Sequence, residues 1–134
     1  MEDCLFCKMV NKEIPANIVY EDDMVLGFLD ISPVNAGHVL VIPKKHFKDL
    51  FEVEENYLTA VTKAIPKIAK SVLDAVDAKD FNLIVNNGEI AGQVIPHLHF
   101  HIIPRFTDDG HELFHGKEMS PDELSVIADK IKSA

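Results

Sequence analysis

Three histidines alternate with apolar residues in the stretch His97–Ile103, whose sequence is HLHFHII. Successive side chains of a β-strand point to opposite faces of a sheet, so His97, His99 and His101 are predicted to share one face. An imidazole has an ordinary pKa of about 6.5 and can act as a nucleophile or base near neutral pH. A lone histidine is usually a solvated polar residue. Three in strict alternation, just after the glycine-containing run 86–93, favour a chemical role.

The length of the row indicates more than one site. A strand rises about 3.3 Å per residue, which would place the Cα atoms of His97 and His101 about 13 Å apart. A Zn–N bond is only about 2.1 Å long. Two neighbouring histidines could chelate one ion, but all three could not easily do so from a straight strand. We therefore expect the row to divide its work between sites.

The only two cysteines, Cys4 and Cys7, lie three residues apart in a predicted helical turn over residues 3–10. In a cytosolic chain such a pair is more often metal-binding or redox-active than a structural disulfide. A redox pair normally follows a strand in a thioredoxin-like βαβ pattern, which this sequence lacks. Structural zinc takes four ligands, so two more would come from the seven histidines. Two buried thiols without a metal are the alternative.

The elements that must position these residues follow from hydrophobic periodicity and turn chemistry. Strands are predicted at residues 18–20, 24–31, 39–42, 81–85 and 97–104. A long amphipathic helix is predicted over residues 52–77, continuing past Pro66. A capping box at residues 120–123 begins a terminal helix over residues 121–132. Three strands, a helix and two strands predict a single α+β domain over residues 1–134, with a mostly antiparallel five-stranded sheet, one long helix and short N- and C-terminal helices.

Composition restricts the class of protein and its partners. The chain has 134 residues, of which 47% are hydrophobic and 26% charged, as in an ordinary globular domain. The formal net charge of −9 disfavours a nucleic-acid polymer as partner, because phosphate contacts need Lys and Arg. No signal-peptide pattern and no apolar run of membrane-spanning length are present, so a cytoplasmic protein without a membrane partner is expected.

The triad followed by two apolar residues resembles the signature of the histidine triad (HIT) family of nucleotide hydrolases and transferases. Further matching blocks are DCLFCK at 3–8, DISP at 30–33, GHVLVIPKKH at 37–46 and AGQ at 91–93. The resemblance covers nearly the whole chain and is strongest to the bacterial form of the small Hint-like group. It implies the α+β fold described above. It also implies a homodimer with the long helix and the triad-side sheet edge at the interface.

The resemblance implies a role for each of four histidines. His99 resembles the nucleophile that attacks the α-phosphorus of an adenosine-type nucleotide, and water then resolves the nucleotidyl-histidine. In the family, the second ring nitrogen of this residue donates to the backbone carbonyl of the first triad histidine, here His97. His101 would bind phosphoryl oxygens and help the leaving group take a proton. His38 resembles the fourth active-site histidine; without the resemblance, a strand-start residue bonded to nearby backbone is equally good.

The resemblance also implies a nucleotide pocket. Asp30 resembles the aspartate that accepts both ribose hydroxyls. Glycine backbone N–H groups and the side-chain amides of Asn86 and Gln93 would hold the phosphate. The phosphate run comprises Asn86, Gly88, Gly92, Gln93 and Val94. The positions that match the base pocket, equally explained as core, are Leu5, Phe6, Met9, Phe28, Leu29 and Ile31.

Two further expectations rest on the resemblance. Bacterial relatives of this type resemble a Cys-Cys-His-His zinc site, which here would comprise Cys4, Cys7, His46 and His97, with His97 serving the structural metal. At position 94, three residues before the first triad histidine, Hint-like proteins usually carry a serine or threonine. Val94 lacks that hydroxyl, and this weakens the expectation of efficient phosphoramidate cleavage. Alternatively, the valine side chain is there to fill an apolar gap.

Together these features favour a purine nucleoside phosphoramidase that releases AMP and binds a purine mononucleotide. A dinucleoside polyphosphate hydrolase is the alternative within the same family. A nucleotide-binding or interaction module with vestigial activity is the alternative outside enzymes, and Val94 lends it weight. A metal-dependent dioxygenase with the triad as ligands is a further possibility, which full activity in EDTA would contradict.

Overall fold

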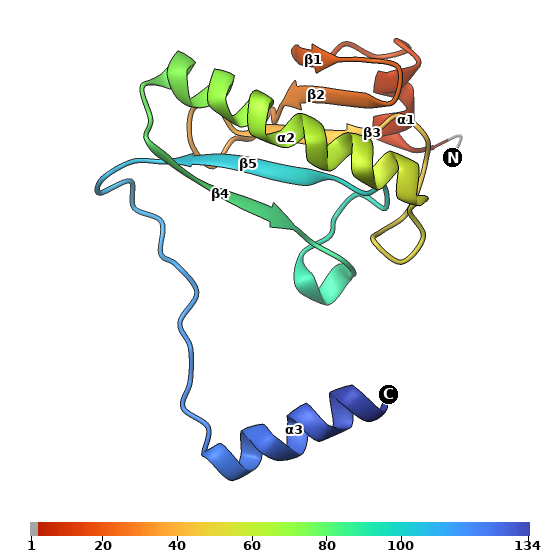
Figure 1. The fold of residues 1–134 in the computed structure, drawn as a ribbon. Helices are drawn as coiled ribbons and strands as arrows, with labels where there is room; N and C mark the ends of the chain where they lie inside the picture. The colour runs from red at the N-terminus through yellow and green to blue at the C-terminus, as the bar shows by residue number, and fades with distance from the viewer. Residues whose placement is uncertain (1–2) are drawn as a thin grey trace.

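Residues 3–134 are described by a computed structural model, in which a five-stranded antiparallel sheet carries one long helix on one face (Figure 1). The strand order is β1-β2-β3-β5-β4. The strands are β1 (Ile18–Glu21), β2 (Val25–Leu29), β3 (Val39–Pro43), β4 (Asp80–Val85) and β5 (Phe100–Arg105). The helices are α1 (Leu5–Val10), α2 (Glu55–Val76) and α3 (Pro121–Ser133), with a 3-10 turn, η1, at Glu89–Ala91. The predicted α+β fold is confirmed.

The two faces of the sheet carry two separate cores because side chains alternate along β2 and β3. In β3, Val39 and Val41 pack against α2, while Leu40 and Ile42 pack on the opposite face beneath α1. All five residues of β3 are buried, which confirms the prediction of a strand covered on both sides. The N-terminal turn therefore lies on the sheet face opposite the long helix.

Helix α2 packs its apolar stripe on the sheet and continues past Pro66, as predicted. Proline has no N–H and would leave the carbonyl four residues earlier without its helical donor. Pro66 is exposed, so that carbonyl lies toward solvent and can bond water instead. The helix begins after Glu54 and ends before Asp77, slightly inside the predicted range 52–77.

The strand of the triad is shorter than the predicted range 97–104 and begins at Phe100. The register pairs Val41 with Phe100, so Pro43 would lie opposite Leu98 and has no N–H to offer. The backbone N–H of Leu98 donates instead to the carbonyl of Phe47, at 2.7 Å. The side-chain alternation survives, because Leu98, like Phe100, is buried in the helix-side core.

The C-terminal helix α3 forms behind the predicted capping box but lies away from the sheet, at the end of an extended segment (Figure 1). Ser120 and Glu123 make both reciprocal capping hydrogen bonds. None of its residues is buried, and Leu124 and Ile131 are 53% and 70% exposed. Within residues 3–134, no helix combines the length and apolarity needed to cross a bilayer.

Candidate functional site

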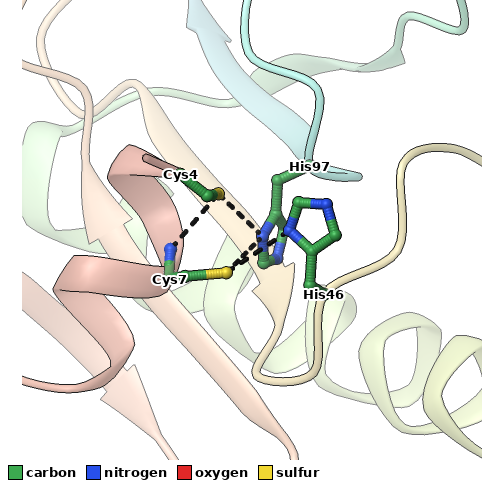
Figure 2. Close-up of side chains that lie close together, drawn as sticks. All are labelled: Cys4, Cys7, His46 and His97. Atoms are coloured by element: carbon green, nitrogen blue, oxygen red, sulfur yellow. Dashed lines mark hydrogen bonds between the residues drawn. The ribbon is translucent and has the colours of Figure 1, made fainter. Parts of the chain in front are cut away.

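The histidine row divides between two clusters, as its length predicted. Cys4, Cys7, His46 and His97 converge on one point, with one ligand atom of each within 4.8 Å of the others. Figure 2 shows Cys4, just before α1, and Cys7, on α1, facing the two imidazoles, which come from the loops after β3 and before β5. His99 and His101 belong to the second cluster, near His38 and Asp30.

The geometry of the first cluster fits a tetrahedral metal. The Sγ atom of Cys4 lies 3.4 Å from Nδ1 of His97, and Sγ of Cys7 lies 3.3 Å from Nδ1 of His46. Zn–S and Zn–N bonds of about 2.3 and 2.1 Å give a tetrahedral S–N edge of about 3.6 Å. Nε2 of His97 donates to the carbonyl of Pro43 at 2.9 Å, which leaves the Nδ1 lone pair directed at the sulfurs.

The ionisation of these residues also suits a cation. Burial lowers the pKa of His97 from 6.5 to about 4, so this imidazole is neutral at physiological pH and available as a ligand. Burial, with a further contribution from the adjacent Cys4, raises the pKa of Cys7 to about 11. Two thiolates side by side therefore need a positive charge between them, which a divalent metal supplies. The four residues form a closed ligand set.

His99 is held in the tautomer that a nucleophile needs. Its Nδ1 donates to the backbone carbonyl of His97 at 2.7 Å, so Nε2 carries the lone pair. The side chain is buried, and burial lowers its pKa, which keeps the ring unprotonated near neutral pH. The ring of Phe6 meets His99 edge to face with centroids 5.1 Å apart. Phe6 lies between Cys4 and Cys7 on the chain and so joins the metal cluster to the nucleophile.

His38 and His101 form a hydrogen-bonded pair whose proton positions follow from the backbone. The N–H of Val34 donates to Nδ1 of His38 at 3.0 Å, so His38 carries its own proton on Nε2. Nε2 of His38 donates to Nδ1 of His101 at 2.9 Å, which leaves the His101 proton on Nε2. That Nε2 atom is buried and has no hydrogen-bond partner in the structure. Burial, reinforced by His99 and His38, lowers the pKa of His101 to about 4.

Asp30 lies beside this pair, with Oδ2 3.6 Å from Nε2 of His38 and Oδ1 accepting from the backbone N–H of Ser32 at 2.8 Å. Asp30, His38 and His101 also bring ligand atoms within metal-binding distance. Nδ1 of His38 is already an acceptor, however. A metal on Nε2 would displace the only ring proton and leave an imidazolate, or break the bond to Val34. Of the two clusters, the cysteine cluster therefore suits a metal ion better.

The apolar residues expected at the base pocket divide into three buried residues, two exposed residues and Leu29, which lies on the other face of the sheet. Phe6, Met9 and Phe28 are buried together beneath α1 on the sheet face that carries the triad imidazoles. Leu5 and Ile31 are 40% and 85% exposed. Their side chains are free to cover a ligand, as a binding rim requires.

Leu29 was expected in the base pocket, and its position corrects that expectation. The side-chain alternation of β2 turns Leu29 to the α2 face, together with Val25. There it borders a cavity of about 620 Å³ between the sheet and α2, remote from the imidazoles. Leu29 therefore supports the helix-side core and does not contact a nucleotide held at the triad.

The loop before the triad also differs from the expectation. The side-chain amide of Gln93 is buried and fully used: Nε2 donates to the carbonyls of Lys48 and Ile95, and Oε1 accepts from Gly88 N–H at 2.9 Å. The N–H of Gly92 donates to the carbonyl of Glu89. Gln93, Gly88 and Gly92 therefore build the loop and offer no donor to a phosphate.

Two residues of the same loop remain accessible. Asn86 makes only a long contact of 3.5 Å to the carbonyl of Gly92, so its amide can still reach a ligand. Val94 is 85% exposed and fills no apolar gap.

A hydrogen-bond network around Asp109 was not anticipated from the sequence. The guanidinium of Arg105 forms two hydrogen bonds with the carboxylate of Asp109, at 2.8 and 3.0 Å. Arg105 holds the pKa of Asp109 well below its usual range. Nδ2 of Asn35 donates to Asp109 and to the carbonyl of Pro104, both at 2.9 Å. Because Asn35 lies about 70 residues from Pro104 and Asp109 in the chain, local sequence patterns did not indicate this network.

Comparison with known proteins places this architecture among related chains. The HIT domain family model matches residues 11–108. An uncharacterized HIT-like protein of Methanocaldococcus jannaschii is 44% identical, over 96% of this chain and 98% of that protein. The protein hit of Bacillus subtilis is 42% identical, over 97% of this chain and 92% of its own length. The crystal structure of a Streptococcus mutans protein has a TM-score of 0.94 at 41% identity, covering 99% of this chain and 85% of that chain.

Three similar proteins have names that specify an activity or a metal. An adenosine 5′-monophosphoramidase of Schizosaccharomyces pombe is 35% identical, over 97% of this chain and 96% of that protein. An adenylylsulfatase of Arabidopsis thaliana is 47% identical, over 80% of this chain and 54% of that protein. The crystal structure of a Zn-bound histidine triad family protein from Mycobacterium smegmatis has a TM-score of 0.77 at 31% identity, covering 98% of this chain and 97% of that chain.

Proposed function

Because this chain belongs to the HIT family of nucleotide hydrolases, we propose that it cleaves a purine nucleoside phosphoramidate at the α-phosphorus and releases AMP. The observation that carries the proposal is the hydrogen bond from Nδ1 of His99 to the carbonyl of His97. This bond fixes the lone pair on Nε2 of a buried, neutral imidazole. The Schizosaccharomyces pombe relative is named for the same activity, and this chain covers 96% of its length.

The proposed chemistry has two balanced steps. Nε2 of His99 attacks the α-phosphorus, a P–N bond to His99 forms, and the bond to the leaving amine breaks. Nε2–H of His101, a buried donor that bonds no other group of residues 3–134, gives the amine its proton, and the negative charge left on the His38–His101 pair offsets the positive charge that the new P–N bond places on the His99 ring. Water then attacks the phosphorus, returns a proton to His101 and restores the electron pair to Nε2 of His99. Splitting the displacement in this way replaces one difficult step by two easier ones.

The remaining site residues bind the nucleotide in this proposal. The carboxylate of Asp30 accepts the ribose hydroxyls, and the free amide of Asn86 donates to the phosphate. The base lies over Phe6, Met9 and Phe28, with Leu5 and Ile31 at the rim. A net charge of −9 does not oppose a mononucleotide, because the imidazole and amide donors act locally.

The test is to trap the covalent intermediate. The protein is mixed with a slowly released adenosine phosphoramidate, quenched in denaturant and analysed by mass spectrometry of its peptides. We expect AMP on the peptide that contains His99 and no adduct in His99→Gly. His115→Gln, on the exposed arm, serves as the control for the loss of a histidine outside the cluster of Asp30, His38, His99 and His101 (the nucleotide cluster). Normal turnover by His99→Gly would disprove the nucleophile assignment.

The same assay separates the alternatives. Faster release of AMP from a diadenosine polyphosphate than from the phosphoramidate would identify a dinucleoside polyphosphate hydrolase. Faster cleavage of adenosine phosphosulfate would follow the adenylylsulfatase relative. Tight AMP binding with no adduct and no turnover on any of these substrates would identify a nucleotide-binding module.

We propose that the cysteine cluster holds one structural Zn²⁺ ion. Cys4, Cys7, His46 and His97 would hold it, and the donor distances and the neutral His97 fit the ion. A Zn-bound relative covers 98% of this chain. With all four positions taken by protein, the ion would supply no chemistry to the reaction and would fix α1 against the triad. Metal analysis of untagged protein tests the proposal, and one zinc per chain is expected.

We also propose that the protein is a homodimer. The edge strand β4 lies open on its outer side, and its Phe81 and Leu83 are 37% and 48% exposed. The arm that ends in α3 presents an apolar stripe that residues 3–134 leave unburied. A second copy that extends the sheet from β4 would give both surfaces a partner. Light scattering should show a dimer, and Leu83→Lys should shift it toward the monomer, whereas exposed Lys79→Ala should not.

A further inference from the structure

We propose that Asn35 is a positioning residue: by fixing the loop that carries Val34, it keeps the proton of His101 on Nε2. This inference rests on the proposed function only for the use of that proton. The position of the proton itself follows from hydrogen bonds in the free protein. The side-chain hydrogen bonds of Asn35 go to Pro104 and Asp109, so it would act through its neighbours.

The first step of the argument is the anchoring of Asn35. Its Nδ2 donates to the carbonyl of Pro104, at the end of β5, and to Oδ2 of Asp109. Asp109 is itself clamped by the guanidinium of Arg105 and accepts from the backbone N–H groups of Phe106 and His111. The carboxylate is almost completely buried, so its arrangement is rigid. Asn35 therefore ties an otherwise exposed loop to the end of the triad strand.

The second step joins the anchored loop to the imidazole pair. Nε2 of His111 donates to the carbonyl of Val34 at 3.1 Å, and the backbone N–H of His38 donates to the carbonyl of Asn35 at 3.1 Å. Both contacts orient the N–H of Val34 toward Nδ1 of His38. A backbone N–H can only donate, so it compels Nδ1 to accept and Nε2 to hold the proton.

The third step passes this constraint to the reacting atom. Nε2–H of His38 faces Nδ1 of His101, which must accept, so the only proton of neutral His101 lies on Nε2. If the loop moves and Val34 no longer donates, His38 can adopt either tautomer. With the proton on Nδ1 of His38, Nε2 accepts from His101, and the His101 proton shifts to Nδ1. Nε2 of His101 then has nothing to give a leaving group.

The direct test reads the tautomers of the free protein. In ¹⁵N-histidine-labelled protein, long-range ring couplings distinguish Nδ1–H from Nε2–H. We expect wild-type His101 and His38 to be Nε2–H, and Asn35→Ala to show a mixture at both. Asn82→Ala is the matched control, because Asn82 accepts from Arg105 at 2.8 Å and, among residues 3–134, forms no side-chain hydrogen bond with the loop that carries Val34. Wild-type His101 with Nδ1–H, or an Asn35→Ala protein with unchanged tautomers, would overturn the proposal.

A kinetic test asks whether the proton matters for the reaction. The value of kcat/KM is compared for an alkyl phosphoramidate of AMP, whose amine must be protonated to leave, and for the p-nitrophenyl ester, which leaves as an anion. General acid catalysis is worth roughly 10²–10⁴-fold, so essentially only the molecules with the proton on Nε2 of His101 react, and an equal mixture of tautomers in Asn35→Ala should cost about 2-fold on the amine substrate alone. Asn82→Ala should keep the wild-type ratio between the two substrates.

The outcomes are separable from those of the proposed function. Equal losses on both substrates in Asn35→Ala would show a general structural effect and contradict the positioning role. If wild type cleaves neither substrate, the proposed function fails, and the ring couplings still decide the position of the proton. If Asn35→Ala does not fold, Asn35→Gln, whose longer side chain moves the amide away from Pro104 and Asp109, takes its place in the coupling measurement, and unchanged tautomers in that variant would overturn the proposal.

Discussion

The triad segment contributes His97 to one cluster and His101 to the other, and the ligand atoms of each cluster lie close enough together to hold a metal ion. The two clusters are nevertheless chemically opposite. In the cysteine cluster, the backbone carbonyl of Pro43 takes the Nε2 proton of His97 and directs a lone pair at two sulfurs. In the nucleotide cluster, the N–H of Val34 occupies the lone pair of His38 and directs a proton at His101. Both clusters contain histidines, and these histidines differ in the backbone group that bonds the second ring nitrogen.

The comparison shows that the backbone group bonded to one ring nitrogen decides whether the other nitrogen of that imidazole carries a lone pair or a proton. A carbonyl partner leaves a lone pair on the opposite ring nitrogen, as for His97 and His99, and so suits the proposed roles of ligand and nucleophile. An N–H partner makes the opposite nitrogen a donor, as for His38. Distances among side chains alone would have placed a metal in both clusters. The predictions below test this division.

Removal of the cysteine ligands should have the largest effect. Structural zinc sites bind with roughly 10–16 kcal/mol near neutral pH, and the proposed ion would join α1 to the triad segment. Cys4→Ser combined with Cys7→Ser should abolish zinc binding and sharply lower the melting temperature and AMP affinity together. Metal analysis and calorimetry provide the measurement. Zinc retained at one equivalent would move the site elsewhere, and the nucleotide cluster would be the first candidate.

Loss of Asp30 should affect only the nucleotide cluster. A hydrogen bond to a charged group is worth roughly 1.5–3 kcal/mol, so Asp30→Ala should weaken AMP binding about 10- to 100-fold. Zinc content should not change, because Asp30 belongs to the cluster that holds no metal. Asp30→Asn, which can still accept from Ser32, controls for folding of the loop. An unchanged dissociation constant, measured by titration calorimetry, would remove Asp30 from the ribose site.

The sequence predicted the separation of the clusters better than it predicted their internal chemistry. Period-two alternation placed the imidazoles and apolar residues on opposite faces, and this survived although regular pairing begins only at Phe100. Alternation is local, so the sequence carries it. The shortening depends on Pro43, a residue of another strand, whose missing N–H could be interpreted only once the register was known.

The polar loops show why the rest was out of reach. Gln93 was expected to hold a phosphate because amides are good donors, but its neighbours Lys48 and Gly88 use the whole side chain. Leu29 was assigned to the base pocket, although its face of the sheet follows from the parity of β2. Hydrogen bonds between distant segments, such as Asn35 with Asp109, leave no periodic pattern in a single sequence.

A change of pH should separate the donor histidine from the others. The folded pKa of His101 is about 4, against 6.5 for an ordinary histidine. The unfolded chain therefore takes up a proton first as pH falls, and this histidine's contribution to stability, complete above 6.5, is lost between 6.5 and 4. The slope is at most about 1.4 kcal/mol per pH unit, and less because the side chain is only partly buried.

Urea unfolding across this pH range provides the measurement for zinc-loaded protein. His101→Gln should remove that part of the slope, whereas His115→Gln, which lies on the exposed arm, should leave it intact. An unchanged slope in His101→Gln would mean that His101 is not held neutral by its surroundings, and the proton assignment would lose its basis.

The smallest expected effect concerns Val94 at the leaving-group side of the nucleotide cluster. Its exposed side chain fills no gap, so Val94→Ser should change the free energy of unfolding by less than about 0.5 kcal/mol. A serine hydroxyl could bond the leaving nitrogen beside Nε2–H of His101, and one such bond is worth about 0.5–1.5 kcal/mol. We expect kcat/KM for the alkyl phosphoramidate to rise about 2- to 10-fold.

Val94→Ala decides what such a rise would mean, because it removes the same branched side chain without adding a hydroxyl. A rise in Val94→Ser alone would show that a donor is limiting at the leaving group and that His101 supplies only part of the proton transfer. Equal rises in both variants would indicate relief of a steric barrier to the substrate. No rise in a folded Val94→Ser protein would show that the Nε2–H of His101, fixed by the loop through His38, already suffices.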